Sequence, residues 1–464
     1  MKRLCVLLLY AILFIGCYSN SSVAQHRSAD EPFSMALTGD SIITRKLSVY
    51  DEPEFLQLID IVRSADIAFT NLEMLFHDYE PYPMAESGGT WMRGAPELAG
   101  ELKWAGFDLV SRANNHSGDY GTTGLQLTTK YVEEAGLVHA GVGMSLAEAR
   151  EAKFLETAKA RVALISISSS FANHMRAGRS RDDVPARPGL NPLRYKTTYV
   201  LPEATYASME QTGESMGEFT DQDGVPRGRK EDAPGEMSLF GRDFARGEEA
   251  SIRRVANEND VNEISAVVNN ASRLADFVIV TMHSHEYDRR RDASPGFLED
   301  FARAMIEAGA DVFVGHGPHT LRGIEIFRGK PILYSLGDFL FQNETLDRLP
   351  ADNYDRYELG NDAHVADFND VRYAEDTKGF PTVPGIWEAV IAVPTFRDRN
   401  LSELALYPID LGFGRGRQVR GRPLLADSKL GEKIIGDLQR LSEQYGTEIV
   451  MRRGIGYVQL NNGN

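Results

Sequence analysis

Apolar, β-branched runs that end in polar residues recur along this chain of 464 residues. Their length and their content of valine and isoleucine predict strands buried in the interior of a sheet. The runs lie at 34–41, 65–73, 107–116, 160–168, 275–285, 310–319 and 330–341.

Segments with helical spacing lie between these runs. Four apolar residues between Ser294 and Gly309 share one helix face, with Ser294 expected as the N-cap and Gly309 at the end. They are Phe297, Leu298, Phe301 and Met305. The stretches 95–106 and 125–136 also end in glycine. Strands that alternate with helices predict an α/β core.

Two polar stretches interrupt the alternation. Residues 171–256 are charged and rich in glycine and proline, which predicts a long inserted loop region that is either functional or partly disordered. Residues 343–384 form a second excursion, followed by a strand pattern at 385–396 and an amphipathic helix at 428–445. Five arginines of the first stretch would either bind a polyanion or be solvated: Arg176, Arg179, Arg181, Arg187 and Arg194.

The amino-acid composition narrows the classes of function that the protein can have. The chain is 42% hydrophobic and 25% charged, as in ordinary globular proteins, and its net charge is −17. A sequence-independent nucleic-acid binder needs basic faces, so this class is excluded. Any anionic substrate must therefore meet a local cation.

Residues 1–25 have the layout of a secretory leader, with two basic residues, a short apolar stretch and then small and polar residues. The segment "FIGC" resembles a lipobox, which would make Cys17 a lipidated membrane anchor; ordinary cleavage after Ala24 is the alternative. Both outcomes predict an exported protein of the cell envelope. Because the only cysteines are Cys5 and Cys17, the mature protein has no internal disulfide and no thiolate ligand.

Acids, amides and imidazoles directly follow the apolar runs. In an α/β sheet the carboxyl ends of the strands lie on one side, so these side chains would converge. Carboxylate, amide oxygen and imidazole without cysteine suit Mn, Zn or Fe, and two such ions can hold a phosphoester and activate one water. The side chains concerned are Asp40, Asn71, Glu73, Asn115, His116, His283, His316 and His319.

Each of these residues also has an ordinary structural interpretation. Asp40 would close a turn beside glycine, and Asn114 and Asn115 would be turn formers. A single histidine such as His283 is more often a hydrogen-bonded loop residue than a ligand. Four of the ten histidines nevertheless fall between positions 283 and 319, all near predicted strand ends, which favours a metal site.

The segments "TGDSIITRKL", "ADIAFTNLEMLF", "GFDLVSRANNHSGDYGTTGL", "DFVIVTMHSHEYD" and "EAGADVFVGHGPHTLRGIEIFRGKPILYSLGDFLF" resemble, in this order, the CapA family of poly-γ-glutamate capsule synthesis proteins. That family belongs to the calcineurin-like metallophosphoesterase superfamily. The resemblance implies a four-layer αββα sandwich of two mixed sheets. It also implies a domain at 30–345 carrying the insertion at 171–256, with 346–464 completing the same domain.

The resemblance implies a role for each matching residue. Glu73 would take the bridging position between one or two divalent ions, and His116 would be the general acid that protonates the leaving oxygen. The implied metal ligands are Asp40, Glu73, Asn115, His283, His316 and His319. Residues expected to support the site or contact substrate are Asn71, Asn114, Asp119, His285 and Glu286.

Three departures from the superfamily pattern concern the number of metal ions rather than the fold. Ser41 and Ile42 stand where the histidine of an Asp-x-His motif is usual. His285 stands where relatives commonly carry glycine, and Asp338 where asparagine is frequent.

Two functions from different classes follow. The first is a metal-dependent hydrolase that acts on a phosphoester or on an anionic envelope polymer such as poly-γ-glutamate. The second is a non-catalytic, membrane-attached component of capsule polymer synthesis or export, which would work with membrane proteins of that process. Periplasmic nucleotide hydrolysis has only superfamily analogy in its favour.

Overall fold

The computed structural model describes residues 31–220, 224–225 and 235–460. The predicted leader at 1–25, with Cys17, lies outside these described residues. Within the described ranges, no helix has both the length and the apolar character needed to cross a membrane.

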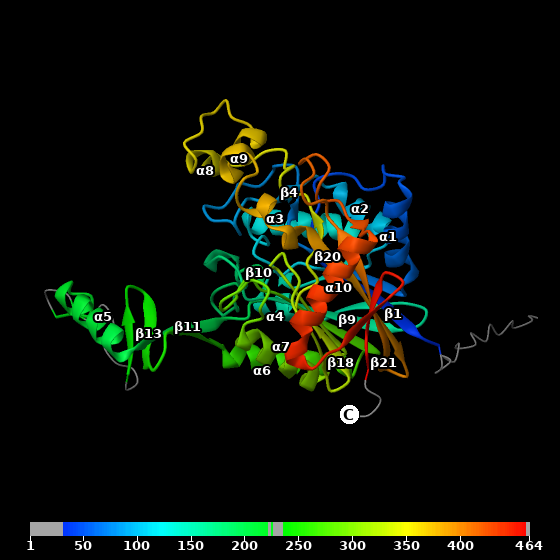
Figure 1. Cartoon of the computed structure of the whole chain (residues 1–464). Helices are drawn as coiled ribbons and strands as arrows, with labels where there is room; N and C mark the ends of the chain where they lie inside the picture. The colour runs from blue at the N-terminus through cyan, green and yellow to red at the C-terminus, as the bar shows by residue number, and fades with distance from the viewer. Residues whose placement is uncertain (1–30, 221–223, 226–234, 461–464) are drawn as a thin grey trace, which may run out of the picture.

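Two sheets lie at the centre of the molecule (Figure 1). The larger has ten strands in the order β23-β24-β21-β20-β1-β2-β5-β6, with β19 beside β1 and β22 beside β21. Its strands are Phe33–Ile42 (β1), Ile67–Leu72 (β2), Leu109–Ser111 (β5), Val138–Ala140 (β6), Asp338–Phe341 (β19), Glu388–Arg397 (β20), Asn400–Asp410 (β21), Leu424–Leu425 (β22), Ile449–Arg452 (β23) and Ile455–Val458 (β24).

The second sheet has six strands in the order β17-β18-β16-β15-β9-β8. Its strands are Lys153–Glu156 (β8), Arg161–Ser168 (β9), Phe277–His283 (β15), Val312–His316 (β16), Ile324–Phe327 (β17) and Lys330–Leu333 (β18). Both sheets are mixed: β1 pairs parallel with β2 but antiparallel with β20, and β16 pairs parallel with β18, which pairs antiparallel with β17. The predicted α/β class is confirmed.

Helices cover the two sheets on their outer faces. α1, α2 and α3 pack on the ten-stranded sheet through one apolar cluster, and α6 and α7 pack on the six-stranded sheet through another. A third cluster joins the facing sides of the two sheets and includes residues of α10. The helix bounds are Pro53–Ser64 (α1), Leu98–Ala105 (α2), Gly121–Glu134 (α3), Glu258–Ser272 (α6), Gly296–Ala308 (α7) and Ser428–Ser442 (α10).

Strand β1 shows why its residues 35–37 are all apolar. Met35 and Leu37 lie in the cluster between the sheets, whereas Ala36 lies in the cluster beneath α1 and α2. Successive side chains of a strand point to opposite faces. A strand that is covered on both faces therefore needs apolar residues at every position.

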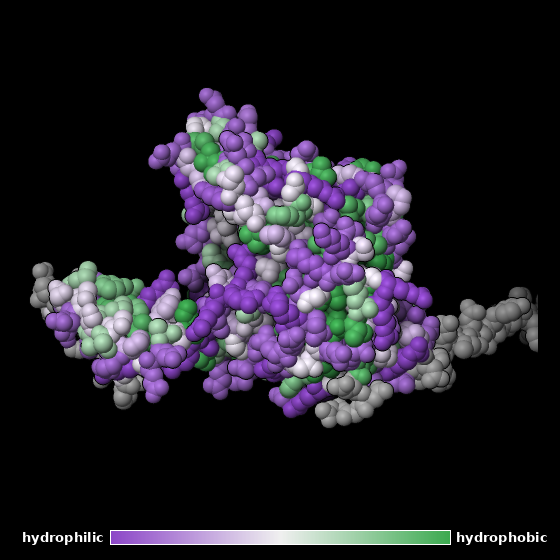
Figure 2. All heavy atoms as spheres, viewed as in Figure 1, coloured by the Kyte–Doolittle hydropathy of each residue, from purple (hydrophilic) through white to green (hydrophobic). Residues whose placement is uncertain are grey.

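The predicted loop region at 171–256 contains regular structure, so this expectation was wrong. Four strands form a sheet in the order β12-β13-β11-β14, and β11, β12, β13 and helix α5 share their own apolar cluster. The lobe projects from the body in Figure 1, and Figure 2 shows apolar side chains on its surface. Its strands are only partly buried, so polar residues dilute the strand pattern. Its elements are Tyr195–Pro202 (β11), Glu203–Ser215 (α5), Glu236–Leu239 (β12), Arg242–Gly247 (β13) and Ser251–Ala256 (β14).

The apolar run at 330–341 forms two strands in different sheets instead of the single strand predicted. β18 belongs to the six-stranded sheet and β19 to the ten-stranded sheet. Gly337 turns the chain between them with a φ of 75°, a left-handed conformation that favours glycine. The predicted N-cap Ser294 is also wrong, because α7 has Pro295 at its N-cap and no side-chain cap.

The excursion at 343–384, called the cap from here on, contains two short helices, Ala351–Asp355 (α8) and Val365–Tyr373 (α9). Several smaller elements complete the fold. They are Leu75–Phe76 (β3) paired with Arg93–Gly94 (β4), Val142–Gly143 (β7) paired with Gly189–Leu190 (β10), and Leu146–Arg150 (α4).

Candidate metal centre

The predicted site residues lie at the carboxyl ends of parallel strands. Glu73 directly follows β2, and Asn115 and His116 lie in the turn after β5. His283 and His316 are the last residues of β15 and β16 and are direct partners in the register of that parallel pair. The strand register thus brings together histidines that are 33 residues apart in sequence.

Three groups of side chains have ligand atoms close enough to share an ion. Within each group, these atoms all lie within 4.8 Å of one another. Asp40 Oδ1 is 3.6 Å from His283 Nδ1 and 3.5 Å from His316 Nδ1. The groups are Asp40 with His283 and His316, Glu73 with His285 and His319, and Asp40 with His319 and Asp338.

Glu73 lies at the centre of the histidines. Its Oε1 is 3.6 Å from His283 Nε2, 3.7 Å from His285 Nε2 and 3.8 Å from His319 Nε2. His283 therefore faces both Asp40 and Glu73, which makes the two carboxylates parts of one cluster.

Buried acceptors without partners show that these residues fit a cation. Both carboxylate oxygens of Glu73, Oδ1 of Asn115 and Oδ2 of Asp338 accept no hydrogen bond from the described residues. Buried polar atoms are rarely left unsatisfied, and four such oxygens in one cluster match the donor set of a metal site.

The electrostatics of the protein alone agree with this fit. Burial, followed by the charges of Asp40 and Asp338, raises the pKa of Glu73 well above its ordinary value. Burial acts in the same direction on Asp40, but the attraction of His283 and neighbouring histidines is stronger in sum and lowers its pKa. Burial lowers the pKa of His316 to about 3, which leaves a neutral imidazole, the form that binds metals.

Asn71 and Asn114 orient the cluster. Asn71 Nδ2 donates to Asp40 Oδ1 at 2.7 Å, and Asn114 Nδ2 donates to the Leu72 carbonyl at 2.7 Å and to Asn71 Oδ1 at 3.3 Å. Asn115 donates through Nδ2 to the Gly88 carbonyl, which leaves its Oδ1 available as a ligand. The supporting and ligating roles expected of these amides from the sequence stay predictions.

His116 has the geometry of a positioned acid. Its Nδ1 lies 2.7 Å from Asp119 Oδ2, and its Nε2 lies 3.9 Å from Glu73 Oε1. Asp119 is held in turn by the backbone N–H groups of Gly88 and Met92, each at 2.9 Å. Asp119 thereby sets the orientation of the imidazole.

Glu286 stands apart from the cluster. Its carboxylate accepts hydrogen bonds from Ser169, Ser284 and Tyr195 at 2.7 to 2.9 Å. These contacts hold the loop after β15. His285, from the same loop, is in the cluster, so the unusual residue of "MHSHEY" joins the site and Glu286 supports it.

A cavity of about 210 Å³ opens onto this cluster, with His116, His285 and His319 in its wall. Three other residues of this cavity wall were not predicted from the sequence. Arg291 and the cap residue Arg372 line the cavity, and cap residue Phe380 packs edge-on against His319 at 5.8 Å between ring centroids. Asp338, 2.8 Å from His319 Nδ1, was noted in the sequence only as a departure, although its place after an apolar run was a usable signal.

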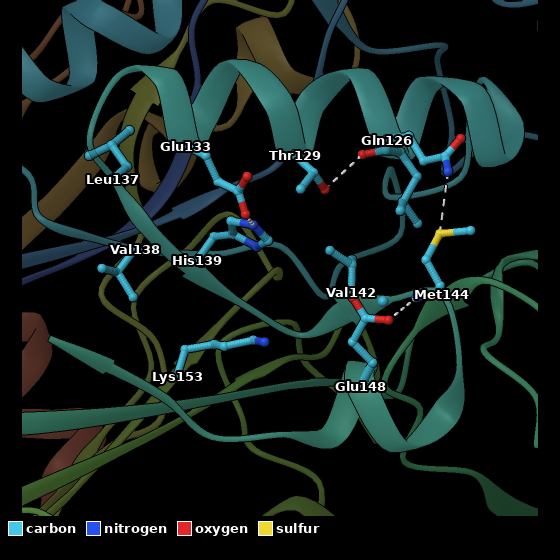
Figure 3. Close-up of a pocket in the computed structure, with 12 residues that line it drawn as sticks. Gln126, Thr129, Glu133, Leu137, Val138, His139, Val142, Met144, Glu148 and Lys153 are labelled. Atoms are coloured by element: carbon cyan, nitrogen blue, oxygen red, sulfur yellow. Dashed lines mark hydrogen bonds and ion pairs between the residues drawn. The ribbon is translucent and has the colours of Figure 1, made fainter.

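A larger cavity of about 410 Å³ lies elsewhere, beside α3 and α4 (Figure 3). Its wall combines apolar residues with His139, Glu133, Glu148 and Lys153. None of the grouped ligands of the metal centre lines it. Cavity size alone therefore does not locate the chemistry in this protein.

Fold and site together define an α/β protein with a candidate metal centre at the ends of its strands. Residues 34–343 match the family described as bacterial capsule synthesis protein PGA_cap, and the chain belongs to that family. The resemblance to CapA proteins seen in the sequence is thus confirmed, and the calcineurin-like superfamily is consistent with it.

Several curated proteins are similar over most of the chain. The uncharacterized protein y4sH of Sinorhizobium fredii is 38% identical and the alignment covers 92% of this chain and 93% of that protein. Capsule biosynthesis protein CapA of Bacillus anthracis is 24% identical over 68% of this chain and 61% of its own length. PGA biosynthesis protein CapA of Bacillus subtilis is 25% identical, and the alignment covers 72% of this chain and 69% of that protein.

Proposed function

We propose that this protein is a metal-dependent hydrolase of the cell envelope, acting on a phosphoester or on an anionic polymer such as poly-γ-glutamate. One observation carries the proposal: the buried carboxylate of Glu73 has no hydrogen-bond partner among the described residues and faces three imidazoles. A stable protein rarely keeps such a group unless it has a function. The capsule-related names of the Bacillus relatives agree with an anionic polymer as substrate.

The fold proposed with this function is the four-layer αββα sandwich of metallophosphatases, and the two helix-covered sheets support it. We also propose export, directed by the leader at 1–25, with Cys17 as a lipid anchor in the membrane. An envelope location would place the enzyme beside the membrane proteins of capsule synthesis.

One or two divalent ions, Mn, Zn or Fe, fit the site. When bound, such ions supply Lewis acidity toward an oxyanion and lower the pKa of water. The protein would hold them through Asp40, Glu73, Asn115, His283, His316 and His319, with His285 and Asp338 close enough to take part.

The remaining chemistry belongs to the residues around the ligands. Protonated His116 would deliver its Nε2 proton to the leaving oxygen or nitrogen, while Asp119 holds the opposite ring nitrogen. Asn71 and Asn114 keep the Asp40 carboxylate in place. The cap residue Phe380 covers His319 and helps to exclude water.

The second candidate is a non-catalytic component of capsule polymer synthesis. The names of the two Bacillus relatives favour it, since they describe biosynthesis rather than hydrolysis. If the protein is such a non-catalytic component, the metal centre would have a structural role.

Metal analysis and hydrolysis assays on the full purified chain separate the two candidates. We expect bound Mn, Zn or Fe, cleavage of 4-nitrophenyl phosphate or of poly-γ-glutamate, and loss of both metal and activity in Asn115→Ala/His319→Ala. The matched control is Asn257→Ala/His174→Ala, whose residues lie outside the metal groups. Metal-loaded wild type that cleaves neither substrate would favour the non-catalytic role.

A further inference from the structure

Two arginines from distant parts of the sequence meet at the cavity of the metal centre. Arg291 lies in the loop after β15, and Arg372 lies in α9 of the cap. Both line the cavity together with His116, His285 and His319. The cavity therefore has metal-ligating groups on one part of its wall and guanidinium groups on another.

These two guanidinium groups lack the carboxylate partners that most other arginines of the protein have. Among the described residues, no ion pair includes Arg291 or Arg372. Arg372 donates to Thr90 Oγ1, and the guanidinium carbon of Arg291 lies 6.0 Å from the ring centroid of Phe380. In a chain of net charge −17, two cations without carboxylate partners on one cavity wall indicate an anionic ligand.

The arginines that the sequence offered as polyanion ligands are, by contrast, mostly engaged. Arg194 Nε donates to Asp260 at 2.7 Å, Arg179 pairs with Glu263, and Arg187 Nε donates to the Arg176 carbonyl. Two of these contacts tie the segment before β11 to α6, and the third lies within that segment. The cations available to a ligand at the metal centre are therefore those on the cavity wall.

Ion pairs, one of them buried, hold the cap, and with it Arg372, in position. Arg420 makes a two-point contact with Glu344, and both side chains are at most 4% exposed. Arg417 pairs with Asp370 and Asp376, and Asp370 lies in α9 only two residues before Arg372. A preorganised guanidinium loses little conformational freedom when it binds an anion.

We propose that Arg291 and Arg372 recognise a second anionic group of the substrate, next to the group held at the metal centre. This specificity role rests on the proposed function. The planar guanidinium matches phosphate and carboxylate oxygens equally well, so the shared chemistry is an oxyanion. The cavity of about 210 Å³ leaves room beside the metal centre for a neighbouring anionic group of the substrate.

Binding to the Mn²⁺-supplemented full chain tests the proposal without requiring turnover. Calorimetry would compare inorganic phosphate, which offers one anionic group, with pyrophosphate and tri-γ-glutamate, which offer several. In Arg291→Gln/Arg372→Gln we expect affinity for at least one of the larger probes to fall about tenfold or more, with phosphate affinity changed by less than about twofold. The probe that responds identifies phosphate or carboxylate as the second group.

Matched controls are Arg289→Gln, an exposed neighbour in the same loop, and Arg356→Gln, an exposed arginine of the cap. Neither lines the cavity, and both should bind all probes as the wild type does. Arg372→Lys keeps the charge without the planar fork and should give an intermediate loss. Thermal melting establishes that each variant is folded.

Three results would overturn the proposal. If the double variant loses as much affinity for phosphate as for the larger probes, the two arginines bind the reacting group instead of a second anionic group. Unchanged affinity for both larger probes in the double variant, or no binding of either probe by metal-loaded wild type, would remove the second anion site. A different result would contradict the proposed hydrolysis alone: wild type that binds these probes but cleaves no substrate.

Discussion

His116 and Asp119 form a buried pair in which Nδ1 of the imidazole lies 2.7 Å from a carboxylate oxygen. The backbone N–H groups of Gly88 and Met92 hold the same carboxylate at 2.9 Å each. With Nδ1 engaged, Nε2 is the nitrogen that faces the metal centre, 3.9 Å from Glu73. This arrangement distinguishes His116, the proposed proton donor, from the imidazoles that would bind metal.

Replacement of His116 by glutamine should lower kcat by about 10²- to 10⁴-fold, the usual contribution of a general acid. Metal content should stay at the wild-type level, because His116 belongs to none of the grouped ligands. Asp119→Asn should lower kcat less and change the pH–rate profile. His174→Gln, outside the cluster, serves as control. A loss of metal in the His116 variant would instead show that His116 is a metal ligand.

Replacement of Glu73 by glutamine should remove bound metal yet stabilise the metal-free protein. Burial raises the pKa of Glu73 above its ordinary 4.5, so the folded state holds this proton more tightly than the unfolded state. The stabilisation is complete below the ordinary pKa and is lost as pH rises through the folded value. Metal-free wild type should therefore become less stable with rising pH, and the variant should lose this dependence.

Chemical denaturation with chelator present, at about pH 5 and about pH 8, measures both effects. The neutral amide should make the variant more stable than wild type by about 1–3 kcal/mol or more at the higher pH, because it removes the cost of burying an ionised carboxylate without a partner. Glu432→Gln, at an exposed position of α10, should change nothing. Equal stability of wild type and Glu73→Gln at both pH values would contradict the prediction.

His139, in the cavity of Figure 3, should make the protein sensitive to acid. Burial, followed by the charges of Arg112 and Lys153, lowers its pKa from 6.5 to about 3. Between pH 6.5 and about 3, His139 binds a proton in the unfolded chain but not in the folded protein. The free energy of unfolding therefore falls as the pH falls through this range. His139→Gln should reduce that slope by up to about 1.4 kcal/mol per pH unit, measured by denaturation at several pH values. An unchanged slope would show that His139 is not the titrating group.

A methyl group at Gly39 should disrupt the metal centre without touching a ligand. A Cβ there would lie 1.7 Å from the Gly337 carbonyl oxygen, so the turn before β19 and Asp40 must move apart. We expect Gly39→Ala to lose most of its bound metal, measured by elemental analysis. Gly436→Ala in α10 meets no atom within 4 Å and should instead stabilise the protein by about 0.5–1 kcal/mol. Full metal content in Gly39→Ala would contradict this prediction.

Loss of Arg420 should loosen the cap. Arg420→Gln leaves Glu344 buried beside fewer cations, which costs about 3–5 kcal/mol when a buried pair is broken. Limited proteolysis should then cut within 343–384 before the rest of the protein unfolds. Arg420→Gln/Glu344→Gln should recover part of the loss. If the double variant is no more stable than the single variant, the pair is not the source of the effect.

The α/β class and the residues of the candidate site could be predicted from the amino-acid pattern alone. Apolar runs mark buried strands because a strand covered on both faces needs apolar residues throughout, and polar residues after such runs mark strand ends. These are local properties of the chain. Asp40, Glu73, Asn115, His283, His316 and His319 could be named from them, and family resemblance supplied their roles.

Other features depend on contacts between segments that are distant in the sequence. The run at 330–341 divides between two sheets because Asp338 pairs with Asp40 in the register of β19 and β1, and no local pattern records that pairing. Arg291, from the loop after β15, and Arg372, from the cap that the Arg420–Glu344 ion pair holds, line one cavity although they are far apart in sequence. Contacts between distant segments depend on how the layers pack, and a linear pattern of apolar and polar residues carries no such information.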